Sequence, residues 1–346
     1  MLLLLLIIYT RFNPPTLYTL SDITTVVLTA GQSNAVGGFS RLNKTANYRW
    51  KDRPHNKIFV WAKQSPEGAY KWLRANIRKE GIDQFWITSP KTCDGPRLQI
   101  PENGTVPGQS HAGFYIARNI VEQDPNEVVG IIPTGCNGMP IEYWMKTDYD
   151  GSTHLPQQPL QDTFGIVANA IDSLKKAPNP DIGVDLVWWM QGEENVEAPI
   201  LTDQGTVNTD AHMNKLRAVI DSFTAQSWFG SGRSQMFVAN HIYVGKLEER
   251  ANKFNTLQKR RDLIQSQSEL NEAFESLNND DFNGNVITND QLLRPHTCSN
   301  KIDKIATVDK LHFDAETLSR IGESVADKYL GRERCGDEFF KRTGKL

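Results

Sequence analysis

The chain has 346 residues, of which 39% are hydrophobic and 23% are charged, and its formal net charge is −3. This is the composition of an ordinary globular protein, long enough for one large α/β domain or two small ones. No basic block points to nucleic acid as a partner, and no acidic tail is present.

The only long apolar run is at the beginning of the sequence, in residues 1–8. It is far too short to cross a bilayer as a helix, so we expect no stable membrane insertion. It could be the core of a secretory signal, although it lacks a basic start and a clear small-x-small cleavage site. A secreted or extracellular protein is therefore expected, and a cytoplasmic protein with a misassigned start is the alternative.

Cysteine and histidine spacing gives no metal motif. The four cysteines are widely separated and form no C-x-x-C pair: Cys93, Cys136, Cys298 and Cys335. They could form disulfides in a secreted protein, but the sequence does not fix their pairing. Four histidines show no ligand spacing with cysteines or acids: His111, His154, His241 and His296. Neither a metal nor another cofactor is predicted.

Apolar runs and helical patterns alternate along the chain. The runs predict strands at residues 24–28, 57–62, 128–133, 184–190, 235–239 and 285–288. The patterns predict helices at 110–122, 160–176, 210–223 and 314–330, with more than one helix within 246–277. Alternation without a linker or repeat predicts one α/β domain, with a largely parallel sheet covered by helices on both faces. We place this domain at residues 21–332, between an apolar segment (1–20) and a polar tail (333–346).

Residues 63–108 interrupt this alternation. They are rich in proline, glycine and aromatic residues, which predicts a long insertion of loops and short turns that shapes a binding surface. The alternative is that the aromatic residues of this region simply cover the hydrophobic core: Trp72, Phe85 and Trp86.

Chemically useful residues follow the predicted strands. The first strand runs into Gly31-Gln-Ser-Asn34, the third into a glycine turn at 135–138, and the fourth into Gln191-Gly-Glu193. An Asp309-Lys-Leu-His312 segment precedes the last helix. Because the carboxyl ends of parallel strands share one edge of a sheet, we expect these segments to converge there.

This set of residues contains the parts of a serine hydrolase. The Ser33 hydroxyl needs a base, which His312 can supply, and Asp309 can hold the imidazole in the right tautomer. The backbone N–H groups of Ser33 and Gly138 and the Gln191 amide are candidate donors to an oxyanion. Each part also has a simpler interpretation: Ser33 or Asn34 as a helix N-cap, Asp309 as the cap of a turn, and 191–193 as a strand-to-loop junction.

Together the blocks resemble the SGNH hydrolase superfamily and, within it, the sialate O-acetylesterase-like carbohydrate esterases. The resemblance covers residues 24–330 and rests on four blocks: Gly31-Gln-Ser-Asn34, Asn137-Gly-Met-Pro-Ile-Glu-Tyr-Trp144, Trp189-Met-Gln-Gly-Glu193 and Asp309-Lys-Leu-His-Phe313. The second block departs from the family pattern, with Asn137 in place of a glycine and Met139 in place of a threonine. That departure weakens the assignment of Gly138 as a donor.

The resemblance implies a three-layer αβα sandwich of the flavodoxin-like kind, with a mostly parallel five-stranded sheet. It implies Ser33 as nucleophile, His312 as general base and then acid, and Asp309 as its orienting partner. The oxyanion hole would be formed by Ser33, Gly138 and Gln191. Further support for the site would come from Gln32, Asn34, Asn137 and Glu193. Glu193 and Glu194 would be structural; a glycosidase carboxylate pair is disfavoured because adjacent side chains point apart.

The implied activity is removal of O-acetyl groups from a carbohydrate through an acetyl-enzyme. Acetylated sialic acid, acetyl xylan and other acetylated glycans remain open as substrates. Two alternatives are a broader esterase or lipase-like hydrolase of the same superfamily and an inactive sugar-binding homologue. The expected partner is the acetylated carbohydrate, not a nucleic acid.

Overall fold

The computed structural model describes part of the chain. The described residues are 18–32, 35, 55–63, 68–75, 85–86, 97–98, 112–136, 139–145, 159–175, 179–230, 232, 234–239, 251–252, 254–279, 284–287, 313 and 315–332. The proposed signal segment and the C-terminal tail lie almost entirely outside them, so the predicted domain bounds remain a prediction.

One sheet forms the centre of the molecule. Its strands follow the order β4-β5-β2-β6-β1-β7-β8-β9, and β3 pairs with β2 outside this path. Six strands form a continuous parallel ladder: β2 (Ile58–Lys63), β6 (Val129–Pro133), β1 (Thr25–Gly31), β7 (Leu186–Met190), β8 (Gln235–Ala239) and β9 (Gly284–Ile287). A short strand, β5 (Arg97–Leu98), extends the parallel pairing beyond β2, and β4 (Phe85–Trp86) pairs with β5 in antiparallel orientation.

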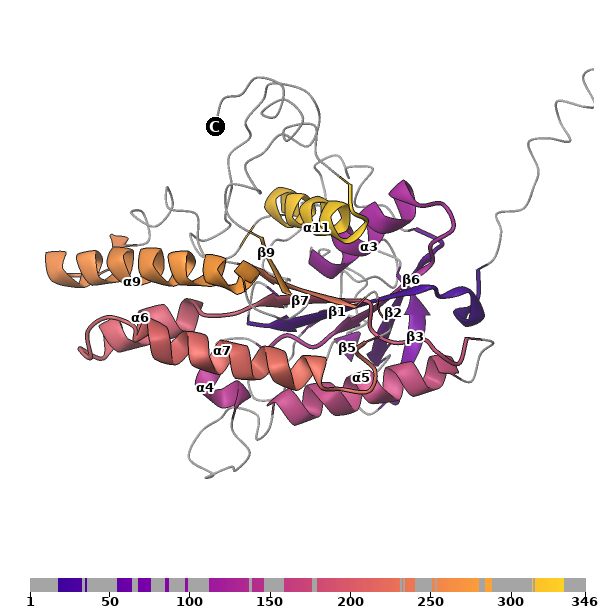
Figure 1. Ribbon diagram of the computed structural model, residues 1–346, viewed down its shortest axis with the longest axis horizontal. Coiled ribbons are helices and arrows are strands. Elements are labelled where there is room, and N and C mark those ends of the chain that lie inside the picture. Colours follow the sequence, from indigo (N-terminus) through magenta and orange to yellow (C-terminus); the bar gives the residue numbers. More distant parts are fainter. Residues whose placement is uncertain are drawn as a thin grey trace, which may run out of the picture.

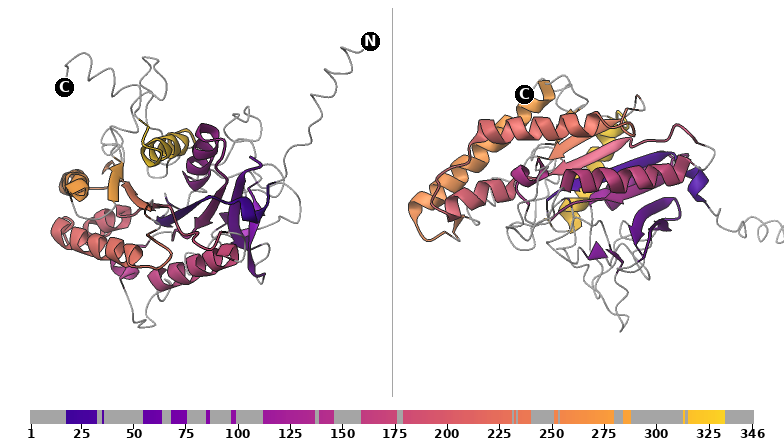
Figure 2. Two further views of the ribbon diagram at one scale, coloured as in Figure 1. Left: turned by 45° about the vertical axis from the view of Figure 1, so that its right-hand side comes forward. Right: turned by 90° about the horizontal axis from the view of Figure 1, so that it is seen from below.

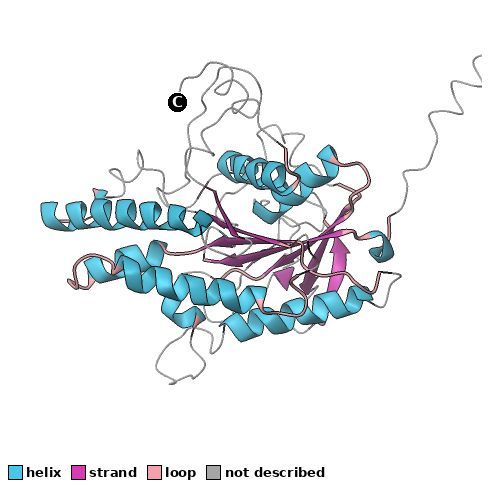
Figure 3. Cartoon of the chain, viewed as in Figure 1, coloured by secondary structure: helices cyan, strands magenta, loops and turns pink. Residues whose placement is uncertain are grey.

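Helices cover both faces of this sheet (Figures 1 and 3). On one face lie α3 (Ala112–Gln123) and α11 (Ala315–Tyr329). Five helices contribute to the core on the other face: α4 (Ile141–Trp144), α5 (Pro159–Lys175), α6 (Glu193–Leu201), α7 (Thr209–Thr224) and α9 (Leu257–Glu275). The described residues also include two short 3-10 helices, η1 (Leu20–Asp22) and η4 (Ser276–Asn279). The predicted three-layer α/β sandwich is confirmed, with a sheet wider than five strands.

The central strand β1 shows why the parallel strands are continuous apolar runs. All seven of its residues are buried. Val26, Leu28 and Ala30 belong to the core cluster beneath one layer of helices, and Val27 belongs to the cluster on the opposite face. Successive side chains of a strand alternate between faces, so a strand covered on both faces needs an apolar residue at nearly every position.

The region expected to be loops contains a real strand. β3 (Tyr70–Arg74) pairs with β2 in antiparallel orientation, and Trp72 is buried with its ring against Gly130 of β6. For Trp72, the interpretation that the aromatic residue covers the core is correct. The side chains of Phe85 and Trp86 lie outside the described part. Within that part, no helix is both long and apolar enough to cross a membrane.

The helices α3 and α11 lie side by side on one face of the sheet (Figure 2). Their close approach depends on Gly322 in α11, where an added Cβ would lie 2.5 Å from the Cβ of Tyr115 and 2.6 Å from its carbonyl carbon. Backbone atoms cannot rotate away as the end of a side chain can. In contrast, Gly165 in α5 is exposed, and a Cβ there would meet no atom within 4 Å.

This difference gives a matched pair of substitutions for testing the packing of α3 against α11. We expect Gly322→Ala to lower the free energy of unfolding by roughly 1–3 kcal/mol, because the added methyl group forces the two helices apart. We expect Gly165→Ala to leave it unchanged or raise it by up to about 1 kcal/mol, because alanine favours the helix. Urea unfolding followed by circular dichroism measures both. Equal effects of the two substitutions would contradict this account of the helix contact.

Candidate active site

Three segments leave the sheet at the same edge. In the parallel register, Gly31 at the end of β1 pairs with Met190 at the end of β7, and Thr29 pairs with Pro133 at the end of β6. The residues that follow these strands therefore start close together. The sequence predicts this convergence for the three strand ends, and the fourth predicted segment, residues 309–312, lies outside the described residues.

Gly31 is required at this edge by its backbone. Its φ is +117°, and a Cβ added there would lie 2.1 Å from the carbonyl oxygen of Met190. The next backbone N–H, of Gln32, donates to that same oxygen at 2.6 Å. The N–H of Cys136 donates to the carbonyl oxygen of Gly31 at 2.7 Å. Only glycine has both the conformational freedom and the small size for this position.

Gln32 connects the segment after β1 to the start of α6. Its side chain is buried, and its Oε1 accepts from the backbone N–H groups of Gly192 and Glu194, each at 3.4 Å. The first N–H groups of a helix have no partner within the helix, so Gln32 serves as a distant, loosely bonded cap. Gly192 precedes the helix with φ +131°, and Glu193, which is 1% exposed, occupies the first turn, where a negative charge is favourable.

Tryptophans from two of the sequence blocks pack against each other behind this edge. The rings of Trp144 in α4 and Trp189 in β7 are in edge-to-face contact, with centroids 4.8 Å apart and an interplanar angle of 68°. Both side chains are fully buried. Their role is therefore to hold α4 against the sheet, which places the residues of α4 near the residues that follow β7.

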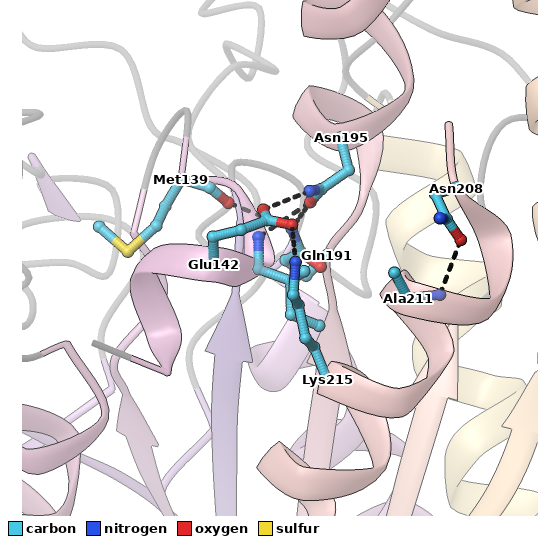
Figure 4. Close-up of polar contacts among 8 residues, drawn as sticks. Met139, Glu142, Gln191, Asn195, Asn208, Ala211 and Lys215 are labelled. Carbon is cyan, nitrogen blue, oxygen red and sulfur yellow. Dashed lines mark hydrogen bonds and ion pairs between the residues drawn. The ribbon is translucent and has the colours of Figure 1, made fainter. Parts of the chain in front are cut away.

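The Gln191 carboxamide, 1% exposed, lies directly after β7. Its Nε2 donates to Oδ1 of Asn195 at 2.6 Å and to the carbonyl oxygen of Met139 at 3.2 Å (Figure 4). These two bonds use both hydrogens of the amide. Its Oε1 is buried and has no hydrogen-bond partner in the described part of the chain. For Gln191 also to donate to an oxyanion, one of these two hydrogens must be shared or redirected. The hydrogen bonded to Met139 is the candidate, because that bond is the longer of the two.

Behind Gln191, a chain of polar contacts runs to α7. Asn195 Oδ1 also accepts from the backbone N–H of Ile141 at 2.9 Å, and its Nδ2 donates to Glu142 Oε2 at 2.6 Å. The other carboxylate oxygen of Glu142 accepts from Lys215 Nζ, also at 2.6 Å (Figure 4). We call Gln191, Asn195, Glu142 and Lys215 the amide network. It joins α4, α6 and α7 at the edge where β7 ends.

The environment of Glu142 favours its charged form. Burial alone would raise the pKa of this carboxyl group. Hydrogen bonds from Lys215, from the backbone N–H of Glu142 and from Asn195, together with the charge of Lys215, outweigh burial and lower that pKa below its usual value. Glu142 is therefore an acceptor of hydrogen bonds at neutral pH.

The described part contains two histidines, and one of them, His55, lies away from this edge. His55 precedes β2, at the amino end of the strands, and α7 contains His212. Burial, together with the charges of Arg118 and Lys57, lowers the pKa of His55 to about 4, so its imidazole is neutral at pH 7. The described residues contain no group of three or more histidines, cysteines or acids that could hold a metal ion.

Of the predicted site residues, the structure brings together Gln32, Gln191 and Glu193 around the start of α6. The others lie outside the described residues: Ser33, Asn34, Asn137, Gly138, Asp309 and His312. Sequence reasoning missed the roles of Asn195, Glu142 and Lys215. Asn195 lies in the first turn of α6 and Gln191 lies before that helix, so the spacing rule for two residues of one helix gives no signal for this pair. Lys215 has no local signal either, because α7 reaches Glu142 only through tertiary packing.

Comparison with known proteins identifies the family. The family model described as "Carbohydrate esterase, sialic acid-specific acetylesterase" matches residues 23–225. No curated protein sequence matches the chain.

The fold is similar to that of NanS, a solved structure of low sequence identity. The crystal structure of NanS is 16% identical with a TM-score of 0.53, and the match covers 93% of this chain and 98% of NanS. A structure from Arabidopsis thaliana is 15% identical with a TM-score of 0.48, covering 89% of this chain and 98% of that one. A variant of Axe2, an acetyl xylan esterase from Geobacillus stearothermophilus, is 13% identical with a TM-score of 0.36, covering 82% and 98%.

The family match spans more than half of the 346 residues and contains three of the four sequence blocks, those beginning at Gly31, Asn137 and Trp189. The block from Asp309 lies beyond it. The chain belongs to the family of carbohydrate esterases described as sialic acid-specific acetylesterases.

Proposed function

We propose that this carbohydrate esterase removes acetyl groups from sugars through an acetyl-enzyme formed on Ser33. The Ser33 hydroxyl adds to the acetyl carbonyl carbon while His312 takes its proton, and Asp309 stabilises the resulting imidazolium. His312 then protonates the departing sugar oxygen as the ester C–O bond breaks. Water, deprotonated by His312, attacks the acetyl-enzyme and releases acetate and free Ser33.

The observation that carries this proposal is the meeting of β1 and β7 at one edge. Gly31 and Met190 pair directly, and the proposed nucleophile follows Gly31 by two residues while Gln191 follows Met190 by one. Phe313, the residue after His312, and Ala35, two residues after Ser33, are both buried in the same core cluster as Met190. The neighbours in sequence of Ser33, Gln191 and His312 thus belong to the core on the same face of the sheet, the face that α3 and α11 cover.

The oxyanion of the tetrahedral intermediate needs donors that are already in place. We assign this role to the backbone N–H groups of Ser33 and Gly138 and to the Gln191 side chain. In support, Gln191 Nε2 lies 3.2 Å from the carbonyl oxygen of Met139, the residue after Gly138. A donor held in place before the reaction stabilises the developing charge without reorganisation during the step.

The state of Cys136 supports a proposal about the compartment. This residue follows β6 closely and is disulfide-bonded, and its partner lies outside the described residues. Disulfides persist in oxidising compartments, so we infer a secreted or extracellular enzyme. Titration of free thiols in the purified unfolded protein, with and without reductant, tests this inference. Equal counts in the two samples would contradict it.

The acetylated sugar is identified by measuring acetate release. We expect release from one or more of three substrate classes: acetylated sialosides, acetyl xylans and simple sugar acetates. A parallel series of nitrophenyl esters should show a sharp preference for acetyl over longer acyl chains. Equal rates on long chains would favour a broader esterase instead, and no release from any acetylated carbohydrate would favour a sugar-binding homologue.

Ser33→Ala tests the nucleophile. We expect kcat to fall by at least ~10³, because no other group can form the acyl-enzyme, while the unfolding transition stays unchanged. Acetate release from the best substrate is the measurement. The matched control is Ser21→Ala, an exposed serine before β1 that should keep full activity. A Ser33→Ala enzyme with a tenth of the wild-type rate would exclude a serine acyl-enzyme.

His312→Ala tests the base. We expect a loss of at least ~10³ in kcat, and we expect the double variant with Ser33→Ala to be no slower than either single variant, because triad members act as a unit. His55→Gln serves as control, since His55 is neutral and lies at the other end of the strands. A loss of less than about tenfold in His312→Ala would assign the base to another residue.

A further inference from the structure

We propose that Glu142 and Lys215 are positioning residues, which act through Asn195 to fix the orientation of the Gln191 carboxamide. This inference rests on the proposed function, in which Gln191 donates to the oxyanion. It adds to that function two residues, on α4 and α7, that do not touch the reacting atoms themselves.

Each hydrogen bond of the amide network has a fixed direction. An ionised carboxylate only accepts hydrogen bonds, so Glu142 requires Asn195 to turn its Nδ2 toward it, at 2.6 Å. The Oδ1 of Asn195 then faces the other way and accepts from the backbone N–H of Ile141 at 2.9 Å. That backbone N–H cannot accept, so it fixes the same orientation of Asn195 independently.

The orientation of Asn195 determines that of Gln191. Asn195 presents an oxygen to it, so Gln191 must present its nitrogen, at 2.6 Å. The carbonyl oxygen of Met139, 3.2 Å away, makes the same demand. If Gln191 were flipped, its Oε1 would face two acceptor oxygens, and the flip would cost both hydrogen bonds in a buried site. The amide network therefore presents an N–H group of Gln191, and not its carbonyl, to the carbonyl oxygen of Met139.

In the proposed mechanism, the orientation of the Gln191 carboxamide affects catalysis. A carboxamide that presents its nitrogen stabilises an oxyanion, whereas one that presents its oxygen repels it. The short bond to Asn195 anchors the amide, and the longer bond to Met139 supplies the hydrogen that can be shared with the oxyanion. Small errors in the position of such a group are costly, because the donor must be aligned before the charge develops.

Lys215 acts at the far end of the amide network. Its Nζ lies 2.6 Å from Glu142 Oε1, and this contact is one cause of the lowered pKa of Glu142. The side chain of Asn208 caps α7 by accepting from the N–H of Ala211 at 3.0 Å, which fixes the start of the helix that contains Lys215 (Figure 4). Lys215 thus holds Glu142 as a charged acceptor in the correct place.

The central variant is Glu142→Gln, which nearly preserves shape but changes the hydrogen-bonding direction. The Lys215 ammonium group will attract the oxygen of the new carboxamide, so that the nitrogen of that carboxamide faces Asn195. This opposes the orientation that Asn195 has in the wild type. We expect kcat to fall roughly tenfold while KM changes by less than about twofold, because only a transition-state contact is lost.

Two variants of Lys215 test its charge. We expect Lys215→Met to lower kcat, and we expect Lys215→Arg, which keeps the charge, to retain most of the wild-type activity.

A double-mutant cycle separates positioning from a general structural effect. If Glu142 acts through Gln191, Glu142→Gln combined with Gln191→Ala should be no slower than Gln191→Ala alone. The matched control is Asp203→Asn, which neutralises the carboxylate of another ion pair, 2.8 Å from Lys259, and should leave kcat unchanged. Losses that multiply in the double variant, or a change in KM alone, would overturn the proposal.

A second measurement needs no substrate. The side-chain NH₂ signals of Gln191 can be assigned by ¹⁵N–¹H NMR, since they disappear in Gln191→Ala. We expect them to shift and to exchange faster with solvent in Glu142→Gln, and to stay in place in Asp203→Asn. Unchanged signals in Glu142→Gln would overturn the positioning role. If the wild type releases no acetate, the proposed function fails, and these signals still decide whether Glu142 orients Gln191.

Discussion

The geometry of the candidate site depends on one backbone contact, the approach of β1 to β7 where both strands end. The carbonyl oxygen of Met190 lies where a Cβ of residue 31 would be, only 2.1 Å from that position, and it accepts the N–H of Gln32. This contact positions Gln32 so that its side chain reaches the start of α6. The carbonyl oxygen of Gly31 accepts the N–H of Cys136, which follows β6. The segments that follow β1, β6 and β7 are therefore joined by hydrogen bonds between backbone groups. The positions of backbone groups vary less than those of side chains. Gly31 is a glycine for this structural reason, which holds whatever the enzyme acts on.

The fold could be predicted from the sequence where burial acts on every residue of an element. The central strands are buried on both faces, so their sequences are continuous apolar runs, and helices such as α3 and α11 have a clear apolar face. β3 could not be predicted, because Tyr70–Arg74 mixes apolar and basic residues and owes its place to Trp72 packing against Gly130. The same is true of α6, which includes Pro199 and buries polar residues such as Glu193 and Asn195. Its position comes from Gln32 and the amide network together with the burial of Val196 and Ile200 in the core.

The candidate site shows the same division. Gln32 and Gln191 could be identified as candidate site residues because they directly follow strands, and position at a strand end is visible in the sequence. The function of Gln32 as a distant cap of α6 could not be identified, since it depends on the register of β1 against β7. Likewise, the sequence block that contains Glu142 was recognised for its resemblance, but the partner of this carboxylate comes from α7, more than seventy residues further along the chain. Contacts that depend on packing between distant helices leave no periodic or local signal.

In the proposed mechanism, the amide network would let a charged residue support an oxyanion site without opposing the negative charge that develops there. A carboxylate beside a developing negative charge would raise the energy of the transition state, and the Coulomb energy of like charges decreases only slowly in a buried site. Glu142 is separated from Gln191 by Asn195, and its charge is paired with Lys215 at 2.6 Å. Glu142 therefore affects Gln191 through the direction of the hydrogen bonds that Asn195 makes, and not through its net charge. Neutral amides are suited to this transfer, because each has one donating and one accepting end whose order is set by the neighbour. A charged group at one end thus specifies the orientation of a neutral donor at the other.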